Sequence, residues 1–325
     1  MKSIKFFSFF LLLCMSCTSI AVATDKAASF SFKEIENQST TSLIDCVFIN
    51  ATDGTKLAYY PYIAQNPIAS MVFLHGGGAY SGAGYQYLAA SLAEKYNVNV
   101  YLVDIRGHGN SEGPRGDSPS VRQVYSDLEV IIKQVEKENF PLPIFLGGHS
   151  SGAGLVLNYI SHVQDESING YFFLSPFFGY KAKTDRANNT SFSDVKVPLF
   201  VFNGMTFGLL FGHSQAVFFN YPKEVLQSQP LLIPSITVNL SLALTPNNPM
   251  DQFRKINKPF GLFIGADDEL MDPGKVMAYA ELPALDIVSR STSQVVENEN
   301  HLSIVMVADR LIGEAIIKQI KQDTN

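Results

Sequence analysis

The chain has 325 residues, of which 46% are hydrophobic and 17% charged, so it can bury a large core and is neither disordered nor fibrous. Its formal net charge is −6 and it has no dense basic run, which argues against nucleic acid as a partner. A chain of this length favours one domain with an insertion.

Residues 1–23 have the layout of a secretory signal peptide. Two lysines precede an apolar stretch over residues 6–15, and small residues ending in Ala21-Val22-Ala23 follow it. The apolar stretch is too short to span a bilayer. We therefore expect residues 24–325 to form the mature domain, secreted or periplasmic after cleavage.

Removal of this segment would also remove two of the three cysteines. Cys14 and Cys17 leave with the signal, so Cys46 remains as a lone thiol and no internal disulfide can form. Cys17 also raises the alternative of a lipid-anchored envelope protein, which the sequence favours less because Cys14 stands where a leucine is usual.

Short β-rich runs alternate with helical patterns along the chain. A turn signal at Asp53-Gly54 joins two runs that we expect to form an antiparallel hairpin at a sheet edge. An amphipathic pattern from Val121 to Val135 predicts a helix. The continuous apolar runs typical of buried strands are MVFLH (71–75), VNVYLVD (98–104), PIFLGG (143–148), GYFFLS (170–175) and PFGLFIG (259–265). This order predicts an α/β fold with a mostly parallel central sheet flanked by helices.

Residues from about 176 to 250 break this alternation. We expect a largely helical lid insertion that covers the carboxyl ends of the strands, where open parallel sheets bind ligands. Its apolar residues predict either an acyl-chain tunnel or lid that contacts a membrane or micelle surface, or the insertion's own core. They are Phe200, Phe202, Phe207, Leu209, Leu210, Phe211, Phe218 and Phe219.

A G-x-S-x-G motif lies between a predicted strand and a predicted helix, the context of a nucleophile elbow. Ser150 has glycine two residues before it and two residues after it, at Gly148 and Gly152, whereas Ser151 has neither. We therefore predict Ser150 as the nucleophile. The N–H of Ser151, at the helix start, is a predicted oxyanion donor.

The second oxyanion donor should follow an earlier strand. His75-Gly76-Gly77-Gly78 ends the first predicted core strand in the HGGG manner. We predict that the N–H of Gly77 donates, with Gly78 as the alternative.

A serine nucleophile needs a base, and the base needs a carboxylate to orient it. In elbow-bearing enzymes these follow in the order Ser, acid, His. His301 lies in a loop before an apolar helical pattern and is the predicted base. Asp267 and Asp268 both follow a predicted strand, and spacing alone leaves the choice of acid open.

These pieces resemble the α/β-hydrolase superfamily, and most closely its branch of monoglyceride lipases, lysophospholipases and S33-like serine aminopeptidases. The matching segments are HGGGAYSGAGY, VDIRGHGNSEGP, GGHSSGAG, GADDELMDP and NENHLSIV. The resemblance implies that the acid follows Gly265 by three positions, which selects Asp268. Two departures from the family pattern are Ala153 after the elbow glycine and Asn300 before the histidine.

The remaining histidines are expected to be structural or packed: His75, His108, His149, His162 and His213. No metal-binding or phosphate-binding motif occurs, so we expect neither a metal nor a cofactor.

The sequence thus predicts a secreted serine hydrolase acting on a small-molecule lipid or ester substrate through a Ser150, His301 and Asp268 triad. Monoacylglycerols and lysophospholipids are the favoured substrates, and oligomeric state is left open. One alternative is a proline iminopeptidase-like aminopeptidase, which would need an acid such as Glu269 or Asp272 to hold a free amine. The other is an inactive binding protein of the same fold.

Overall fold

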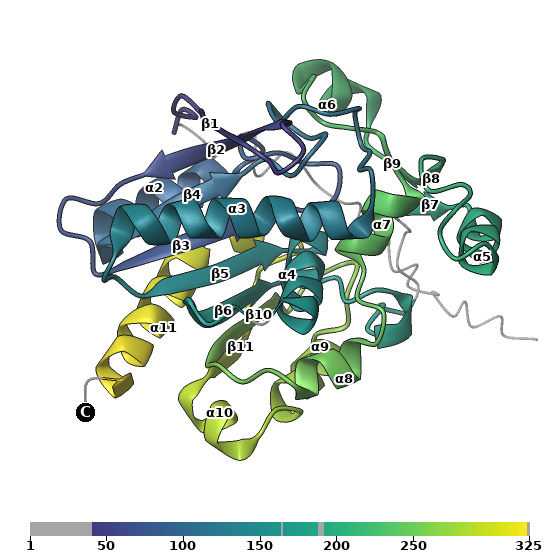
Figure 1. Cartoon of the computed structure of the whole chain (residues 1–325). Coiled ribbons are helices and arrows are strands. Elements are labelled where there is room, and N and C mark those ends of the chain that lie inside the picture. Colours follow the sequence, from purple (N-terminus) through teal and green to yellow (C-terminus); the bar gives the residue numbers. More distant parts are fainter. Residues whose placement is uncertain (1–40, 164, 188–191, 324–325) are drawn as a thin grey trace, which may run out of the picture.

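The computed structural model describes residues 41–163, 165–187 and 192–323, so the predicted signal peptide lies outside the described residues. Its centre is an eight-stranded sheet of order β1-β2-β4-β3-β5-β6-β10-β11 (Figure 1). The strands are β1 (Val47–Asn50), β2 (Lys56–Tyr62), β3 (Ala69–Leu74), β4 (Val98–Val103), β5 (Ile144–His149), β6 (Ile168–Leu174), β10 (Phe260–Gly265) and β11 (Thr292–Val296).

Neighbouring strands are parallel from β4 to β11, and only the β1–β2 and β2–β4 pairs are antiparallel. This confirms the predicted mostly parallel sheet, the five core strands and the edge hairpin. Strand β11 at the opposite edge was not predicted. Its residues are mostly polar and half-buried or exposed, so they lack the apolar run that marks the buried strands.

Helices cover both faces of the sheet and enclose a hydrophobic core on each. Helices α3 (Val121–Asn139) and α4 (Ser151–His162) pack on one face, and α2 (Tyr85–Tyr96) and α11 (Ala308–Asp323) pack on the other. Further short helices are α8 (Pro249–Arg254), α9 (Pro273–Met277) and α10 (Leu285–Arg290), with 3₁₀ turns at Tyr180–Ala182, Ala278–Glu281 and Ser303–Met306.

Helix α3 shows how the sequence sets these elements. Ser120 begins the helix as its N-cap, because its side chain accepts a hydrogen bond from the Gln123 N–H. Val124, Leu128 and Ile131, at helical spacing, are buried against the sheet. The helix predicted over 121–135 is therefore confirmed and extends by one further turn.

Residues 192–244, which we call the cover, depart from the predicted helical lid. They contain a three-stranded antiparallel sheet of β7 (Ser193–Val195), β8 (Gln215–Phe219) and β9 (Ser235–Thr237). The cover's helices are α5 (Val197–Met205), α6 (Lys223–Ser228) and α7 (Val238–Leu244). Strands of three to five residues pair here without a long apolar run, which is why the sequence pattern favoured helices. Helix α7 packs on α3 and α4 and so anchors the cover to the main core.

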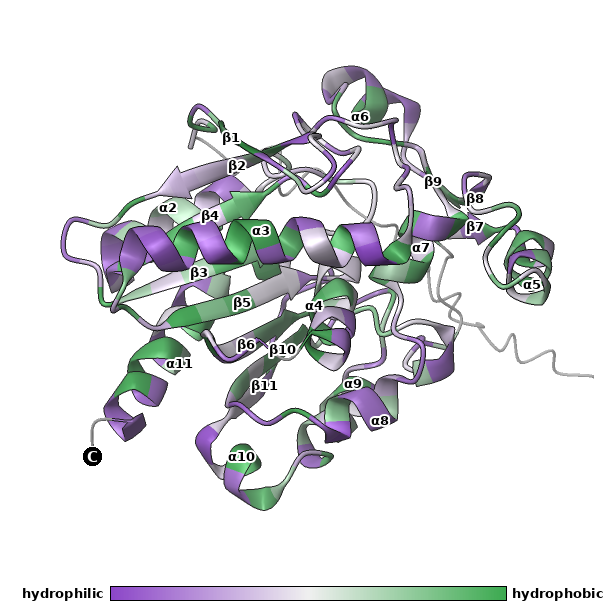
Figure 2. Cartoon of the chain, viewed as in Figure 1, coloured by the Kyte–Doolittle hydropathy of each residue, from purple (hydrophilic) through white to green (hydrophobic). Residues whose placement is uncertain are grey.

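One part of the cover, residues 195–211, includes helix α5 and extends away from the body, and we call it the arm (Figures 1 and 2). Most of its large apolar side chains are exposed: Val195, Val197, Val201, Phe202, Met205, Phe207, Leu209, Leu210 and Phe211. The prediction that the apolar residues of the insertion form its own core is therefore wrong for five of the eight. Within the residues that the structure describes, no helix is both long and apolar enough to cross a membrane.

Candidate active site

Ser150 lies at the sharp turn between β5, near the middle of the sheet, and α4. Its backbone has φ 54° and ψ −120°, a conformation that L-residues rarely adopt. Its carbonyl accepts hydrogen bonds from the N–H groups of Gly154 and Phe177, at 3.2 and 3.0 Å. The turn therefore holds the hydroxyl of Ser150 outward at the carboxyl end of the strand, as the elbow motif predicted.

The two glycines around Ser150 are required by close backbone approach. A Cβ on Gly148 would lie 2.5 Å from the carbonyl carbon of Gly152. A Cβ on Gly152 would lie 2.4 Å from the carbonyl oxygen of His75. These approaches fix the turn against β3, the strand that precedes the HGGG segment. Ala153, the first departure from the family pattern, is fully buried, and the turn still forms.

His301 stands between Ser150 and Asp268, although long stretches of sequence separate the three. Its Nε2 lies 3.0 Å from Ser150 Oγ, and its Nδ1 lies 2.8 Å from Asp268 Oδ2. The other oxygen of Asp268 accepts the N–H groups of Leu270 and Met271, at 3.0 and 2.8 Å. Asp268 is 0% exposed, whereas Asp267 is exposed to solvent and makes no contact with the imidazole.

The pKa values of the buried His301 and Asp268 both differ from their ordinary values. Burial disfavours a charged imidazole, but the charge of Asp268 and its hydrogen bond outweigh this and raise the pKa of His301. Burial would likewise favour a neutral Asp268, yet the charge and hydrogen bond of His301, with the two backbone N–H groups, lower the pKa of this carboxyl. The carboxylate is thus held ionised behind a ring that can accept a proton from Ser150.

The loop around His301 is fixed by its neighbours. The N–H of His301 donates to Oε2 of the buried Glu269 at 3.0 Å. The side-chain oxygen of Asn300 accepts the N–H groups of Leu302 and Ser303, at 3.0 and 2.7 Å. Asn300, the second departure from the family pattern, therefore caps the turn that carries the base.

The two predicted oxyanion donors lie next to each other. A Cβ on Gly77 would lie 3.0 Å from Ser151 Oγ, so the HGGG loop and the start of α4 meet beside Ser150. Gly77 lines the pocket at Ser150, whereas the carbonyl of Gly78 accepts the N–H of Ile233 in the cover, at 2.9 Å. The position favours Gly77 over Gly78 as the donor.

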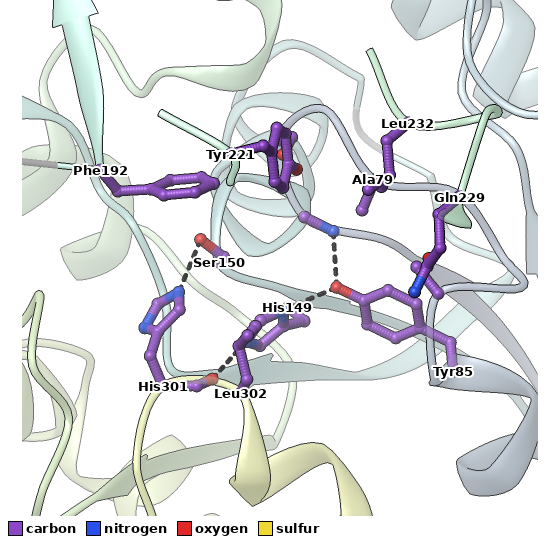
Figure 3. A pocket seen from close by; sticks show the side chains of 13 residues that line it. Ala79, Tyr85, His149, Ser150, Phe192, Tyr221, Gln229, Leu232, His301 and Leu302 are labelled. Atoms are coloured by element: carbon purple, nitrogen blue, oxygen red, sulfur yellow. Dashed lines mark hydrogen bonds between the residues drawn. The ribbon is translucent and has the colours of Figure 1, made fainter. Parts of the chain in front are cut away.

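A second hydrogen-bond chain connects the HGGG loop with the base, and the sequence did not predict it. The Tyr85 hydroxyl accepts the N–H of Gly76 at 2.9 Å and donates to Nδ1 of His149 at 2.8 Å. The other ring nitrogen of His149 then donates to the carbonyl of His301 at 2.8 Å (Figure 3). Burial and the nearby charge of His301 lower the pKa of His149 to about 3, so the ring stays neutral in this chain.

The other histidines lie outside this arrangement, as predicted. His75 and His108 are buried with ring centroids 4.9 Å apart, and His162 bonds the carbonyl of Asn158 in its own helix. His213 lies on the cover, where it pairs with Asp117 at 2.8 Å. No cluster of three metal-ligating side chains occurs within the described parts of the chain.

A small pocket opens at Ser150, under the cover (Figure 3). Its volume is about 50 Å³. The thirteen lining residues are Gly76, Gly77, Ala79, Ala83, Tyr85, His149, Ser150, Phe192, Tyr221, Gln229, Leu232, His301 and Leu302. None of them is an acid, a lysine or an arginine, so the pocket is largely apolar with a few polar groups.

A strained serine at the strand-to-helix turn of a parallel sheet, within reach of an imidazole from a later loop, places this chain among the α/β-hydrolases. The resemblance seen in the sequence is thereby confirmed. Residues 65–292 match the family described as serine aminopeptidase, S33, and the chain belongs to this family.

Relatives of known name extend the comparison. Phospholipase YtpA of Bacillus subtilis is 23% identical over 224 residues, which are 66% of this chain and 82% of that protein. The monoglyceride lipase of Rattus norvegicus is 26% identical over 228 residues, 69% of this chain and 73% of that protein. Two other curated relatives match over 34% and 35% of this chain, and these matches span only 11% and 30% of the length of those proteins.

Solved structures show the same fold. A soluble variant of monoglyceride lipase from Saccharomyces cerevisiae, in complex with a substrate analog, superposes with a TM-score of 0.65 at 18% identity. The alignment covers 86% of this chain and 97% of that protein.

Proposed function

We propose that this protein is a serine hydrolase of carboxylic esters, with lipid esters such as monoacylglycerols or lysophospholipids as substrates. Ser150 attacks the ester carbonyl while His301 takes its proton, and Asp268 holds the imidazole in place. The backbone N–H groups of Gly77 and Ser151 bind the oxyanion, and an acyl-enzyme forms as the alcohol leaves with a proton from His301. Water then attacks the acyl-enzyme by the reverse sequence of proton transfers.

The observation that carries this proposal is the contact of His301 with both Ser150 and Asp268, at 3.0 and 2.8 Å. A base at this distance can take the hydroxyl proton directly. The names of the rat and Bacillus relatives, a monoglyceride lipase and a phospholipase, support lipid esters as the substrate class.

The polar groups near the site favour esters over peptides with a free amino terminus. An aminopeptidase needs a carboxylate to hold the substrate's ammonium group. Glu269 accepts the N–H of His301, and Asp272 accepts the N–H of Lys275 at the start of α9. Neither lines the pocket, which has no acid among its thirteen residues.

The arm supports a lipid surface as the place of action. Nine of its exposed side chains are large and apolar, and from residue 197 to 212 the sequence carries no Asp, Glu, Lys or Arg. Such a patch on an otherwise charged surface favours contact with a membrane or a micelle. Export after cleavage of residues 1–23 is part of the same proposal, and amino-terminal sequencing of the mature protein tests it.

Hydrolysis of monoolein, a lysophospholipid and a prolyl-naphthylamide by the purified protein tests the substrate class. We expect ester turnover and no peptide turnover. Cleavage of the prolyl substrate without cleavage of either ester would overturn the proposal. Fluorophosphonate labelling of the wild type, but not of Ser150→Ala, distinguishes an active enzyme from a binding protein.

A further inference from the structure

The loop that carries the predicted oxyanion donor consists largely of glycine. Gly76, Gly77 and Gly78 follow one another, and glycine has more conformational freedom than any other residue. The body of the protein holds the first of them, because the carbonyl of Gly76 accepts the ring N–H of His75 at 2.8 Å and the N–H of Ala79 at 3.2 Å. An oxyanion donor works only if it is preorganised, so the peptides that follow Gly77 need contacts from outside the loop.

The cover supplies these contacts. The hydroxyl of Tyr221 donates to the carbonyl of Gly77 at 3.0 Å, and the N–H of Ile233 donates to the carbonyl of Gly78 at 2.9 Å. The ring of Phe219 lies against the same two glycines, since a Cβ added to Gly77 or Gly78 would lie 3.0 or 2.7 Å from it. Two hydrogen bonds and one aromatic ring of the cover therefore fix the two peptides after the predicted donor.

The ring of Tyr221 is itself fixed by packing. It is buried, and its centroid lies 5.1 Å from that of Phe192 and 5.9 Å from that of Phe219. Tyr221 and Phe192 both line the pocket at Ser150 and lie on the side of Ser150 away from His301 (Figure 3). A side chain locked in this way holds its hydrogen-bond partner at a constant position.

We propose that Tyr221 is a positioning residue for the oxyanion hole, which makes the cover a part of the active site rather than a lid that only covers it. The inference rests on the proposed ester hydrolysis and concerns the same site. The N–H of Gly77 has no hydrogen-bond partner among the residues that the structure describes, so it is available to an oxyanion. Without the bond from Tyr221 to its carbonyl, Gly77 can rotate and the donor is no longer preorganised. Displacement of the cover from this loop should therefore lower activity.

Tyr221→Phe tests this role, because it keeps the packed ring and removes only the hydroxyl. We expect kcat for a soluble ester, p-nitrophenyl butyrate, to fall about thirtyfold, which is less than the loss of a whole oxyanion donor costs. KM should be little changed, because the contact acts once the oxyanion forms. Initial rates over a range of ester concentrations give both constants.

A pair of ketone inhibitors distinguishes positioning from a general loss of structure. The carbonyl of 1,1,1-trifluoro-2-decanone adds Ser150 Oγ and gives a hemiketal whose negative oxygen occupies the oxyanion hole, whereas 2-decanone has the same skeleton and binds as a neutral ketone. Tyr221→Phe should raise the inhibition constant of the trifluoroketone about as much as it lowers kcat/KM. The inhibition constant of 2-decanone should stay at the wild-type value.

Tyr80→Phe is the matched control. Tyr80 packs against the same small apolar cluster of the cover as Tyr221 but does not line the pocket. Its hydroxyl forms no hydrogen bond within the described ranges of the chain. This variant should keep the wild-type rate and both inhibition constants. Phe219→Leu removes the ring that lies on Gly77 and should repeat the selective effect on the trifluoroketone, which provides the test if Tyr221→Phe folds poorly.

The outcomes separate this inference from the proposed function. If wild type hydrolyses the ester and the folded Tyr221→Phe variant has the wild-type kcat, the positioning role is rejected and ester hydrolysis stands. Equal weakening of both ketones would reject it as well, because a loosened pocket binds both less well. If the folded wild type hydrolyses no ester, the proposed function fails and this inference fails with it.

Discussion

Apolar side chains are buried in the central sheet and exposed on the arm. Every residue of β3 and β5 is buried, whereas Phe207 and Leu209 at the end of the arm are 94% and 84% exposed. Burial of the strands contributes to folding stability, and the same packing sets the turn at Ser150. Exposed apolar side chains contribute nothing comparable to the isolated protein, and we propose that the arm instead contacts a lipid surface.

This difference separates two kinds of substitution. A change at the site on the sheet should alter the chemistry for every ester, whether the ester is dissolved or part of a lipid surface. A change on the arm should alter only the encounter with a lipid surface. Substitutions in the two regions therefore test this separation.

Ser150→Ala should lower kcat by about 10⁶-fold, since loss of the nucleophile removes the covalent route. The loss should be equal for a soluble short-chain p-nitrophenyl ester and for monoolein. Initial rates on both substrates measure it. Ser289→Ala, on the exposed surface of α10, is the control and should leave both rates unchanged. Substantial turnover by Ser150→Ala would mean that another group is the nucleophile.

Asp268→Asn should lower kcat by about 10⁴-fold, because the amide no longer holds the imidazole in the required tautomer. The pH profile gives a second test. The pKa of His301 is raised by Asp268, and the protonated ring cannot accept a proton, so wild-type activity should fall as pH drops through a value above the ordinary one of about 6.5. Without the carboxylate this acid limb should move to lower pH.

Asp267→Asn is the matched control, because Asp267 is adjacent in sequence but exposed. Its rate and pH profile should be those of wild type. The reverse result, a large loss at Asp267 and none at Asp268, would contradict the assignment of the acid.

The residues of the predicted triad and its turn also show what a sequence can predict. Gly148, Ser150 and Gly152 were recognised because the elbow motif is local in sequence, although the close approach at Gly152 is to the carbonyl of His75. His301 followed from chain order, and Asp268 needed the family resemblance in addition. The core strands were predictable because burial on both faces makes them continuously apolar.

Other features depend on contacts that no local pattern records. Tyr85 bonds to His149, which is 64 residues away, and nothing in its own segment marks it as different from other tyrosines. Strand β11 is held by pairing with β10 rather than by its own apolarity. The cover's short strands likewise exist through pairing with one another, and the prediction of a largely helical insertion did not include them.

The arm gives the next prediction. Phe207→Ser combined with Leu209→Ser should weaken partition onto phosphatidylcholine vesicles by about 100-fold or more, because burying each of these side chains stabilises the bound state by about 2 kcal/mol. Hydrolysis of a soluble ester should stay at the wild-type rate. Vesicle co-sedimentation and parallel rate assays measure the two effects.

Leu285→Ser controls for apolar exposure as such, since Leu285 on α10 is 86% exposed but lies outside the arm. It should leave vesicle partition unchanged. If the arm variant binds vesicles like wild type, or if it loses soluble activity to the same extent, the separation between sheet and arm fails.

The smallest effect is expected at Tyr85, where the separation meets its most demanding test. Tyr85→Phe removes one hydroxyl and leaves two buried groups, the Gly76 N–H and His149 Nδ1, without that partner. His149 in turn bonds the carbonyl of His301. Without the Tyr85 hydroxyl, the positions of His301 and of the HGGG loop should therefore be less well fixed. We expect kcat to fall about tenfold, with KM little changed, as for an interaction that matters mainly in the transition state. Tyr87→Phe, a half-buried tyrosine on the same helix, should have no such effect. The fall in kcat should be the same for soluble and aggregated esters, since these hydrogen bonds affect only the chemical step. A loss of activity confined to aggregated substrate would contradict this expectation. It would mean that the hydrogen bonds of Tyr85 affect the cover, whose residues line the same pocket.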